Sequence, residues 1–502
     1  MKKPFYFFYI SLFLTISLLP SAGLIFTGIR QPSINQESDS APALFTEGSL
    51  NPFFLSDAGA WFEDHFAFRE EAITAYALLL GKCFGVSSQE RVITGTDGWL
   101  FYKDSLADFQ GTAPMTGRQL FNVAHSLAMV QAYAQKNGAS FAFAAAPNKN
   151  SLYGTYMPYY YQPLRTGKSN LERLEEYLQS EQVNTIDLYQ IFRDDGSVLY
   201  HKRDSHWNNE GAALAADKIL NGLEKEHSAY TDRTYTVKKD FEGDLHHMLY
   251  PAMPKLEEEI YYDPAPQFTY CEEVESNFAP KITTRSNGSG SLVMYRDSFG
   301  NALLPFLAEA FETAYFSRAL PYYLPELSEQ KADALIIERA ERFLPDMACQ
   351  APAMEAPAVV WDAAAMGAAV KANRLEELAQ GTYTQITGNL PLDLVKERSR
   401  IYIRVNGSTC YEAFPVSGAD GKEGFSMLLP SKQLQDTDHT FEVYLSEQAA
   451  NPAVPDQTED INGQQNGEKT ILRRDDYPDC DGSGHGYAEI YYSDGTMEIE
   501  EY

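Results

Sequence analysis

The spacing of hydrophobic residues changes several times along the chain, and the first change comes near the N-terminus. An uncharged stretch runs from Pro4 to Ile29, and its apolar part, Phe5–Phe26, is long enough to cross about 30 Å of hydrocarbon as a helix. Two lysines precede it, which predicts a cytoplasmic N-terminus. We expect residues 1–29 to be an uncleaved anchor, with a cleaved signal peptide as the alternative. The expected location is the cell membrane, single-pass, with the rest of the chain extracytoplasmic.

Residues 51–379 show patterns typical of strands alternating with helices. A helix with aromatic residues on one side is expected around position 61, where Trp61 lies. A hairpin is expected at Arg91–Tyr102, where two β runs flank a Thr-Asp-Gly turn. Apolar runs of strand length occur at Ser140–Ala146, Val183–Leu188, Ser291–Tyr295 and Ala334–Glu338. Helical patterns lie between them, at 116–137, 170–182, 209–220 and 303–311. Such alternation predicts an α/β domain with a mostly parallel sheet.

The remaining segments differ in composition from this domain. Residues 30–50 are polar and proline-containing, as in a spacer, whereas 380–446 contains short β-like runs that predict a small β-sandwich-like domain. Residues 447–474 have the composition of a linker, and 475–502 recovers β-like alternation. Cys480 and His485 in this last segment are two potential metal ligands, but a turn-rich cap is the favoured interpretation because two ligands do not make a site.

Charge and cysteine content exclude several classes of function. The 502-residue chain carries a formal net charge of −30, which argues against nucleic acid or anionic lipid headgroups as partners. Hydrophobic residues make up 44% of it, enough for packed domains. Its five cysteines are scattered without metal-ligand spacing, and no P-loop or dinucleotide fingerprint occurs. No metal and no cofactor are expected.

Two segments carry candidate chemistry, and the first is Arg203-Asp-Ser-His-Trp-Asn-Asn209. In an extended or turn segment, residues two apart project to one side, so Asp204 is placed to reach the ring of His206. A carboxylate bonded to Nδ1–H would fix the tautomer of the ring and leave Nε2 as a base. The alternative is a purely structural helix start, with Asn208 or Asn209 as the cap.

The second segment is a buried strand that runs into Arg296-Asp297-Ser298 and then into a helix. A serine at such a turn lies at the mouth of an α/β sheet, where ligands bind. Either Asp297 or Ser298 could instead simply cap the helix. A serine hydroxyl needs a base to become a nucleophile, so Ser298 requires a partner such as His206. Both segments lie at strand-to-helix turns, which favours the catalytic interpretation.

Asp204-Ser-His206-Trp207 together with Arg296-Asp-Ser298-Phe299 resembles the SGNH-hydrolase-like acyltransferases of the alginate O-acetylation type, the AlgJ/AlgX and DHHW-like group. Further blocks resemble this family in the same order along residues 50–345; they are Trp61–Arg69, Gly95–Tyr102, Pro147–Tyr153 and Ala332–Leu344. The resemblance implies a flavodoxin-like three-layer SGNH domain, circularly permuted, followed by the small β-rich domain.

Carried over by position, the resemblance implies Ser298 as nucleophile, His206 as general base and Asp204 as its partner. The glycine of the family's Gly-Asp-Ser or Gly-Thr-Ser is Arg296 here, which changes the turn that would build the oxyanion hole. Asn148 or Asn301 would donate to the oxyanion, and Lys149 and Arg296 are further candidates for substrate contact. No metal ligand is expected at this site.

The reaction that the resemblance implies is O-acylation of an exported or cell-surface polysaccharide, with acetyl as the acyl group and an acyl-serine intermediate. A multi-pass membrane O-acyltransferase would supply the acyl group, and the N-terminal helix would hold the protein at the same membrane. Two alternatives remain open. The first is a glycan O-acetyl esterase with the same three residues, because water exclusion and not sequence separates the two reactions. The second is a non-catalytic surface protein that binds glycans.

Overall fold

The computed structural model contains two compact units, which are described separately. The first comprises Met1–Lys103, Lys202–Asp204 and Phe241–Glu257, and the second comprises Asp104–His201, Ser205–Asp240 and Glu258–Tyr502. The structure describes residues 3–27, 41–46, 49–162, 167–274, 276–380, 382–418, 421–434, 439–453, 471–477, 486–492 and 497–501. Most of the expected spacer and linker, and both Cys480 and His485, lie outside these residues. The four described cysteines are free.

The first unit contains the expected aromatic helix and hairpin. Trp61 and His65 stack within this helix with ring centroids 4.7 Å apart. The hairpin strands share a small core with a short later helix, through Leu100, Leu245 and Leu249. The elements of this unit are α1 (Lys3–Thr27), β1 (Phe45–Thr46), β2 (Ser49–Leu50), α2 (Phe54–His65), α3 (Arg69–Phe84), β3 (Val92–Thr94), β4 (Leu100–Tyr102) and α10 (Asp244–Leu249). Two strands that pair with each other, β7 (Thr234–Glu242) and β8 (Leu256–Asp263), contribute residues to both units.

The structure corrects the predicted membrane anchor. Crossing the hydrocarbon core requires a helix that is both long and apolar over its whole span. Among the described residues, no helix meets both requirements. The expected single-pass location at the cell membrane is therefore wrong.

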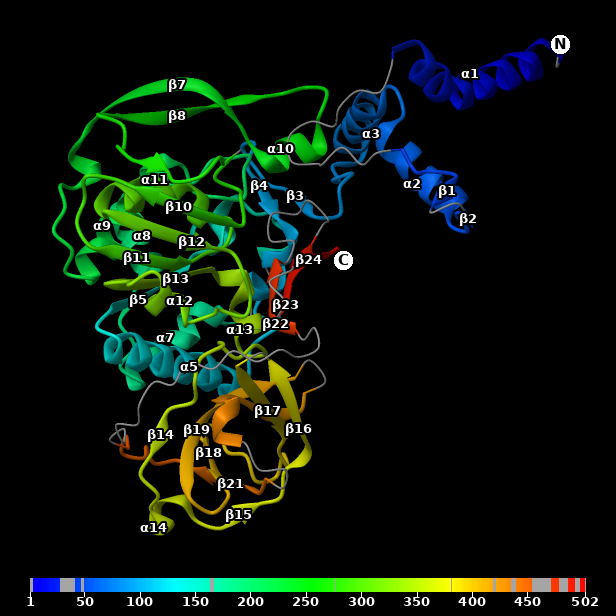
Figure 1. Ribbon diagram of the computed structural model, residues 1–502. Helices are drawn as coiled ribbons and strands as arrows, with labels where there is room; N and C mark the ends of the chain where they lie inside the picture. The colour runs from blue at the N-terminus through cyan, green and yellow to red at the C-terminus, as the bar shows by residue number, and fades with distance from the viewer. Residues whose placement is uncertain are drawn as a thin grey trace. The chain divides into compact units, whose positions relative to one another are not determined.

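A seven-stranded mixed sheet is the centre of the second unit (Figure 1), with the order β6-β5-β13-β11-β12-β10-β9. The first five strands in this order pair in parallel, and β10 and β9 extend the sheet in antiparallel fashion. The mostly parallel α/β fold predicted from the sequence is thus confirmed. The strands are β5 (Ser140–Ala146), β6 (Thr185–Ile186), β9 (Thr269–Tyr270), β10 (Lys281–Arg285), β11 (Ser291–Tyr295), β12 (Thr313–Ser317) and β13 (Ala334–Ala340).

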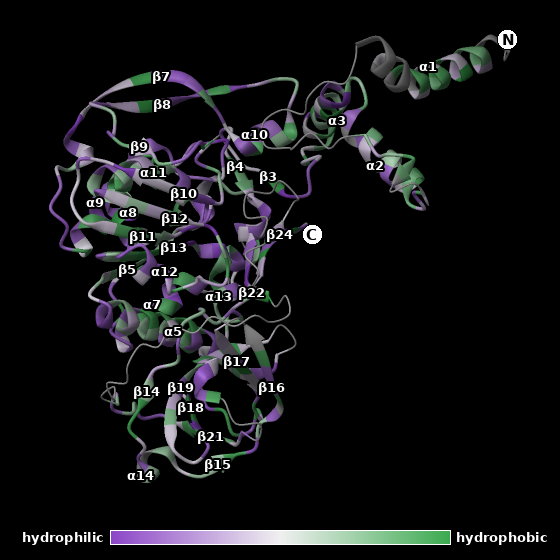
Figure 2. Cartoon of the chain, in the orientation of Figure 1, coloured by the Kyte–Doolittle hydropathy of each residue, from purple (hydrophilic) through white to green (hydrophobic). Residues whose placement is uncertain are grey.

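Two hydrophobic cores, one on each face of this sheet, make the domain three-layered. Side chains alternate between the faces of a strand, so Phe143 of β5 packs with helices α5 and α7, whereas Ala142 and Ala144 pack with α8, α9 and α11. Hydrophobic residues, green in Figure 2, accordingly gather on the strands and on the inner faces of the helices. The helices are α4 (Leu106–Gln110), α5 (Gly117–Lys136), α6 (Lys149–Tyr153), α7 (Asn170–Ser180), α8 (Leu188–Asp195), α9 (Asn209–Gly222), α11 (Gly300–Ala310), α12 (Glu326–Glu329) and α13 (Leu344–Met347).

Local side-chain bonds explain where several of these elements begin. Thr116 and Ser169 both form capping boxes, which start α5 and α7 close to the predicted positions. The strand expected at Val183–Leu188 is shorter, because the Asp187 side chain accepts a hydrogen bond from Gln190 N at 2.9 Å and starts α8. An apolar run alone did not reveal this cap.

The β-rich C-terminal part is confirmed, and most of its strands form one eight-stranded antiparallel sheet. Its own core contains Ile386, Ile401 and Phe425. The sheet consists of β14 (Ala358–Val359), β15 (Ala369–Val370), β16 (Asn373–Gln380), β17 (Tyr383–Asn389), β18 (Arg400–Val405), β19 (Thr409–Ser417), β20 (Glu423–Pro430) and β21 (Phe441–Ser446). A short helix, α14 (Ala363–Met366), lies between β14 and β15 in the sequence. A separate sheet follows, formed by β22 (Ile471–Tyr477), β23 (Tyr487–Tyr492) and β24 (Met497–Glu501).

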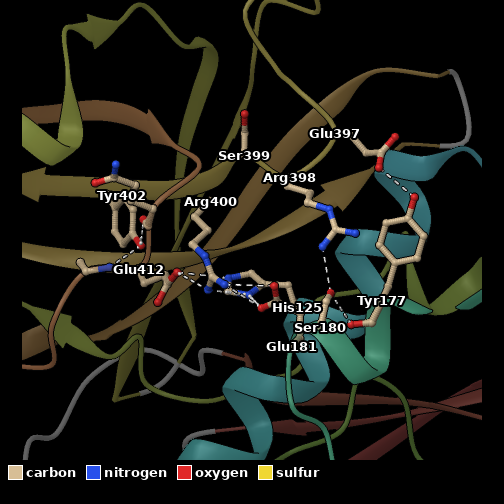
Figure 3. A network of polar contacts seen from close by, with 12 residues as sticks. His125, Tyr177, Ser180, Glu181, Glu397, Arg398, Ser399, Arg400, Tyr402 and Glu412 are labelled. Atoms are coloured by element: carbon tan, nitrogen blue, oxygen red, sulfur yellow. Dashed lines mark hydrogen bonds and ion pairs between the residues drawn. The ribbon is translucent and has the colours of Figure 1, made fainter. Parts of the chain in front are cut away.

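A network of charged side chains joins helices α5 and α7 to strands β18 and β19 (Figure 3). His125 of α5 is fully buried and contacts Glu181 Oε2 at 3.0 Å and Glu412 Oε1 at 3.1 Å. Arg400 binds Glu181 through both carboxylate oxygens, at 3.0 and 2.8 Å. The α/β part and the eight-stranded sheet therefore meet through a largely buried ionic contact.

Candidate functional site

The loop after β11 presents Ser298 at the carboxyl edge of the parallel sheet. Asp297, just before it, fixes the loop through both carboxylate oxygens: Oδ1 accepts from Phe299 N at 2.9 Å, and Oδ2 accepts from Ala340 N at 2.7 Å. Asp297 Oδ1 thus bonds the backbone just before the helix Gly300–Ala310, whose N-cap residue is Phe299 and has no side-chain cap hydrogen bond. Ser298 is buried, and its hydroxyl is turned toward a different partner.

That partner is His206, which lies on a loop held at both ends. Before it, Tyr200 forms a β-bridge with Trp207, and after it the Asn208 side chain accepts from Gly211 N at 2.9 Å and caps α9. Gly211 packs against the Leu199 carbonyl so closely that an added Cβ would lie 2.5 Å from that oxygen. The loop is therefore fixed by the start of α9, and the glycine cannot be replaced without moving it.

Ser298 and His206 are in direct contact, as the sequence predicts. Ser298 Oγ lies 2.9 Å from His206 Nε2, and Ser205 Oγ lies 3.1 Å from Nδ1 of the same ring. When Nδ1 carries the proton and donates it to Ser205, Nε2 is left to accept the proton of Ser298. Phe299 packs beside the ring with centroids 4.9 Å apart, which fixes its orientation. The arrangement can serve nucleophilic catalysis by serine.

Asp204 belongs to the first unit and is buried there. Its Oδ2 accepts from Asp244 N at 2.9 Å, and the next residue upstream, Arg203, pairs with Glu257 at 2.8 Å. The predicted bond of Asp204 to the His206 ring stays a prediction.

Next to Asp297, the sheet buries a carboxyl group that the sequence analysis did not single out. Glu338 of β13 accepts from Asp297 N at 3.1 Å. Burial, and then the charge of Asp297, raises the pKa of Glu338 well above its ordinary value. The surroundings of Glu338 therefore favour the protonated form of its carboxyl group.

A second buried carboxyl group, Glu341, connects β13 to the loop after β5. Glu341 Oε2 accepts from Asn148 N at 2.7 Å and from Ser151 Oγ at 2.8 Å. Burial, followed by the charge of Asp108, raises the pKa of Glu341 to about 8. The side chain of Asn148 is buried, and among the described residues neither its oxygen nor its nitrogen has a hydrogen-bond partner. A buried amide without a protein partner is an expensive feature unless a ligand uses it.

The other three candidates have different surroundings. Arg296 is buried, and its guanidinium donates to the carbonyls of Asn277 and Ala279, both at 3.0 Å, and to the Asn301 side chain. These contacts hold the 277–279 segment against the loop of Ser298. Lys149 is buried at the first position of α6. The structure thus brings Ser298 and His206 together, and it engages Arg296 and Asn301 with each other.

Comparisons with known proteins support the resemblance predicted from the sequence. Residues 92–278 match the model of the SGNH hydrolase-like domain of the acetyltransferase AlgX. This range includes Asp204 and His206 and ends before Ser298. The resemblance to the AlgJ/AlgX group is thereby confirmed, and residues 92–278 are similar to an SGNH hydrolase-like acetyltransferase domain. No curated protein matches the sequence.

Similar solved structures include PatB1 of Bacillus cereus, at 17% identity over 50% of this chain and 96% of that one, with a TM-score of 0.39. A DHHW family protein of Eubacterium siraeum is 15% identical over 44% of this chain and 86% of its own, with a TM-score of 0.35. The O-acetyltransferase domain of Pseudomonas putida AlgJ is 16% identical over 51% and 92%, with a TM-score of 0.33. Likenesses this distant carry no argument about function.

Proposed function

We propose that this protein is an O-acyltransferase that transfers an acetyl group to a hydroxyl of a polysaccharide. The acetyl group is first carried by Ser298 as an acyl-serine intermediate. The observation that carries the proposal is the 2.9 Å contact between Ser298 Oγ and His206 Nε2 at the carboxyl edge of the sheet. The match of residues 92–278 to an acetyltransferase domain supports the type of reaction.

The first half of the reaction loads the serine. His206 Nε2 takes the proton of Ser298 as Oγ attacks the carbonyl carbon of the acyl donor, and the carbonyl oxygen becomes an oxyanion. The unpartnered Asn148 amide is the side chain we assign to this oxyanion, because it is already desolvated. Collapse of the intermediate breaks the bond to the leaving group, which receives the proton from His206, and the acyl group stays on Oγ.

The second half releases the serine. A sugar hydroxyl gives its proton to His206 Nε2 and attacks the acyl carbon. Collapse of the second tetrahedral intermediate breaks the bond to Oγ, and the proton returns from His206 to Ser298. Phe299 contacts the His206 ring and Trp207 (centroids 4.9 and 5.0 Å away), which gives the site one apolar wall that reduces access of water. The acyl donor protein and the polysaccharide stay predictions from the resemblance.

The test uses Ser298→Ala in the full chain with 4-nitrophenyl acetate, and Ser408→Ala, in a turn of the eight-stranded sheet, as the matched control. We expect turnover to fall roughly 10⁴-fold or more in Ser298→Ala and to be unchanged in the control. Unchanged turnover in Ser298→Ala would remove this residue as the nucleophile. A second arm supplies an oligosaccharide acceptor and detects the acetylated product by mass spectrometry. If free acetate is the sole product, the protein is an esterase instead.

A further inference from the structure

A row of polar side chains runs along one face of β17, outside the site described above. Tyr383, Gln385, Thr387 and Asn389 are alternate residues of this strand and therefore point to the same side. The side chain of Ile386, on the opposite face, is buried in the core of the eight-stranded sheet. One face of β17 therefore carries side chains that can form hydrogen bonds, and the face that carries Ile386 packs in the core.

Two clefts lie along this row. One, of about 460 Å³, is lined by Gln385, Thr387 and Asn389, and the other, of about 260 Å³, is lined by Tyr383. Pro321, from the loop after β12, lines both clefts, so they adjoin each other. Their sizes are near the roughly 300–1,000 Å³ of small-molecule sites, and together they suit an extended ligand better than a compact one.

The chemistry of the clefts favours an uncharged ligand. Gln385, Thr387 and Asn389 offer amide and hydroxyl groups, which match sugar hydroxyls as donors and acceptors. Glu329 and Glu355 line the smaller cleft, and their carboxylates can only accept hydrogen bonds, which hydroxyl groups supply.

The cations of the smaller cleft are already paired. Arg473 binds Glu326 at 2.7 Å and also Asp475, and Arg474 binds Asp476 at 2.9 Å and also Glu500. Burial, and then the negative charges of Glu355 and Glu329, raises the pKa of Tyr383. The negative charges of Glu355 and Glu329 also oppose the entry of an anionic ligand, so a polyuronate would be repelled.

Tyr383 also offers an aromatic face. Its side chain is half-buried, and the neighbouring Tyr323 is covered by the Arg473 guanidinium 4.1 Å from its ring centroid. The C–H face of a pyranose ring is apolar and slightly positive, so it packs on the negative face of an aromatic ring. One sugar ring on Tyr383 would direct the next along Gln385 and Thr387.

We propose that the β17 face formed by Tyr383, Gln385, Thr387 and Asn389 binds an extended, uncharged, hydroxyl-rich chain, namely a segment of a neutral polysaccharide. The inference rests on the proposed function in one respect: the bound polysaccharide would be the acceptor of the acyl group. Binding itself needs no turnover.

The test measures binding by calorimetry to the full chain carrying Ser298→Ala, so that no acyl transfer contributes. The probes are maltohexaose, cellohexaose and chitohexaose, with hexagalacturonate as the anionic counterpart. We expect at least one neutral hexasaccharide to bind and hexagalacturonate to bind more weakly. Binding of none of the neutral probes, or tighter binding of hexagalacturonate, overturns the proposal. Because Ser298→Ala is the background, this outcome leaves the result of the esterase assay untouched.

Variants then place the binding on β17. Tyr383→Ala should weaken the neutral probe by about tenfold, which is the upper range for one aromatic contact. Tyr383→Phe should keep most of the affinity, because it keeps the ring. Tyr159→Ala, which removes an exposed tyrosine that does not line either cleft, is the matched control. An equal loss in Tyr159→Ala, or no loss in Tyr383→Ala with circular dichroism unchanged, also overturns the proposal.

Discussion

At the loop of Ser298 a buried acid, Glu338, lies against Asp297, whereas at the junction with the eight-stranded sheet buried acids lie against His125 and Arg400. Glu338 illustrates the first case, since burial and the charge of Asp297 raise its pKa. Glu181 and Glu412 illustrate the second, where burial alone would raise the pKa of each, but hydrogen bonds and charge from His125 lower both. Burial is common to both regions, so the available partners decide whether a carboxyl group keeps its proton.

The two histidines differ in the same way. His206 contacts two hydroxyl groups, those of Ser298 and Ser205, and these suit a ring that exchanges protons. His125 contacts two carboxylates, which favour a ring that stays charged. A base in catalysis must release its proton in each cycle, and the surroundings of His125 oppose release. The comparison predicts that one histidine affects activity and the other affects stability.

The largest expected effect is on activity, in His206→Gln. Without the base, turnover of 4-nitrophenyl acetate should fall roughly 10⁴-fold, as for other serine–histidine pairs. The urea midpoint of unfolding should change little, because the His206 side chain is only partly buried. Retention of most of the turnover would contradict the assignment of His206 as the base.

The next effect is on stability, in His125→Leu. Removing one partner from a buried ionic cluster leaves Glu181 and Glu412 buried with less compensation, which should destabilise the protein by about 3–5 kcal/mol. Turnover per folded molecule should be close to that of the parent. The matched control is Lys396→Ala, which breaks the exposed pair with Glu447 and should cost about 0–1 kcal/mol. Equal costs in the two variants would show that the His125 cluster is no more than a surface ion pair.

These regions differ in how far the sequence could predict them. The strands that carry the site are short apolar runs, so β5, β11 and β13 could be predicted, and the contact of Ser298 with His206 followed from the two motifs. The strands β7, which is mostly exposed, and β8, which is partly buried, contain many charged residues and carried no such signal. The raised pKa of Glu338 could not be predicted from the sequence, because it depends on burial and on which side chain faces the carboxyl group. An apolar strand pattern does not contain that information.

A smaller effect is expected from Glu338→Gln, which sharpens the comparison at the Ser298 loop. A glutamine has the shape of the protonated acid, and its side-chain oxygen can still accept from Asp297 N. Activity should stay within a few-fold of the parent. Glu338→Leu is the contrasting variant, since it leaves Asp297 N without its partner and should cost about 1–3 kcal/mol. If Glu338→Gln destabilises as much as Glu338→Leu, the acid is ionised in the parent.

The smallest effect is the pH dependence that the His125 cluster adds to stability. Burial alone lowers the pKa of His125, but hydrogen bonds from its ring to Glu181 and Glu412 outweigh this, and its pKa lies above its ordinary value. Arg400, which faces the same ring, opposes the increase. A raised pKa means that the stabilisation is complete below about pH 6.5, the value in the unfolded chain, and is lost as the pH rises through the folded value.

For Glu181 and Glu412 the sign is reversed. Their pKa values are lowered in the folded protein, so their contribution is complete above about pH 4.3, the unfolded value, and is lost as the pH falls through the folded values. The cluster should therefore stabilise the junction most between these limits. The measurement is the difference in urea midpoint between the parent and His125→Leu as a function of pH. A difference that does not decrease above about pH 6.5 would mean that His125 is neutral in the folded protein, and the contrast with His206 would then lie in packing rather than in charge.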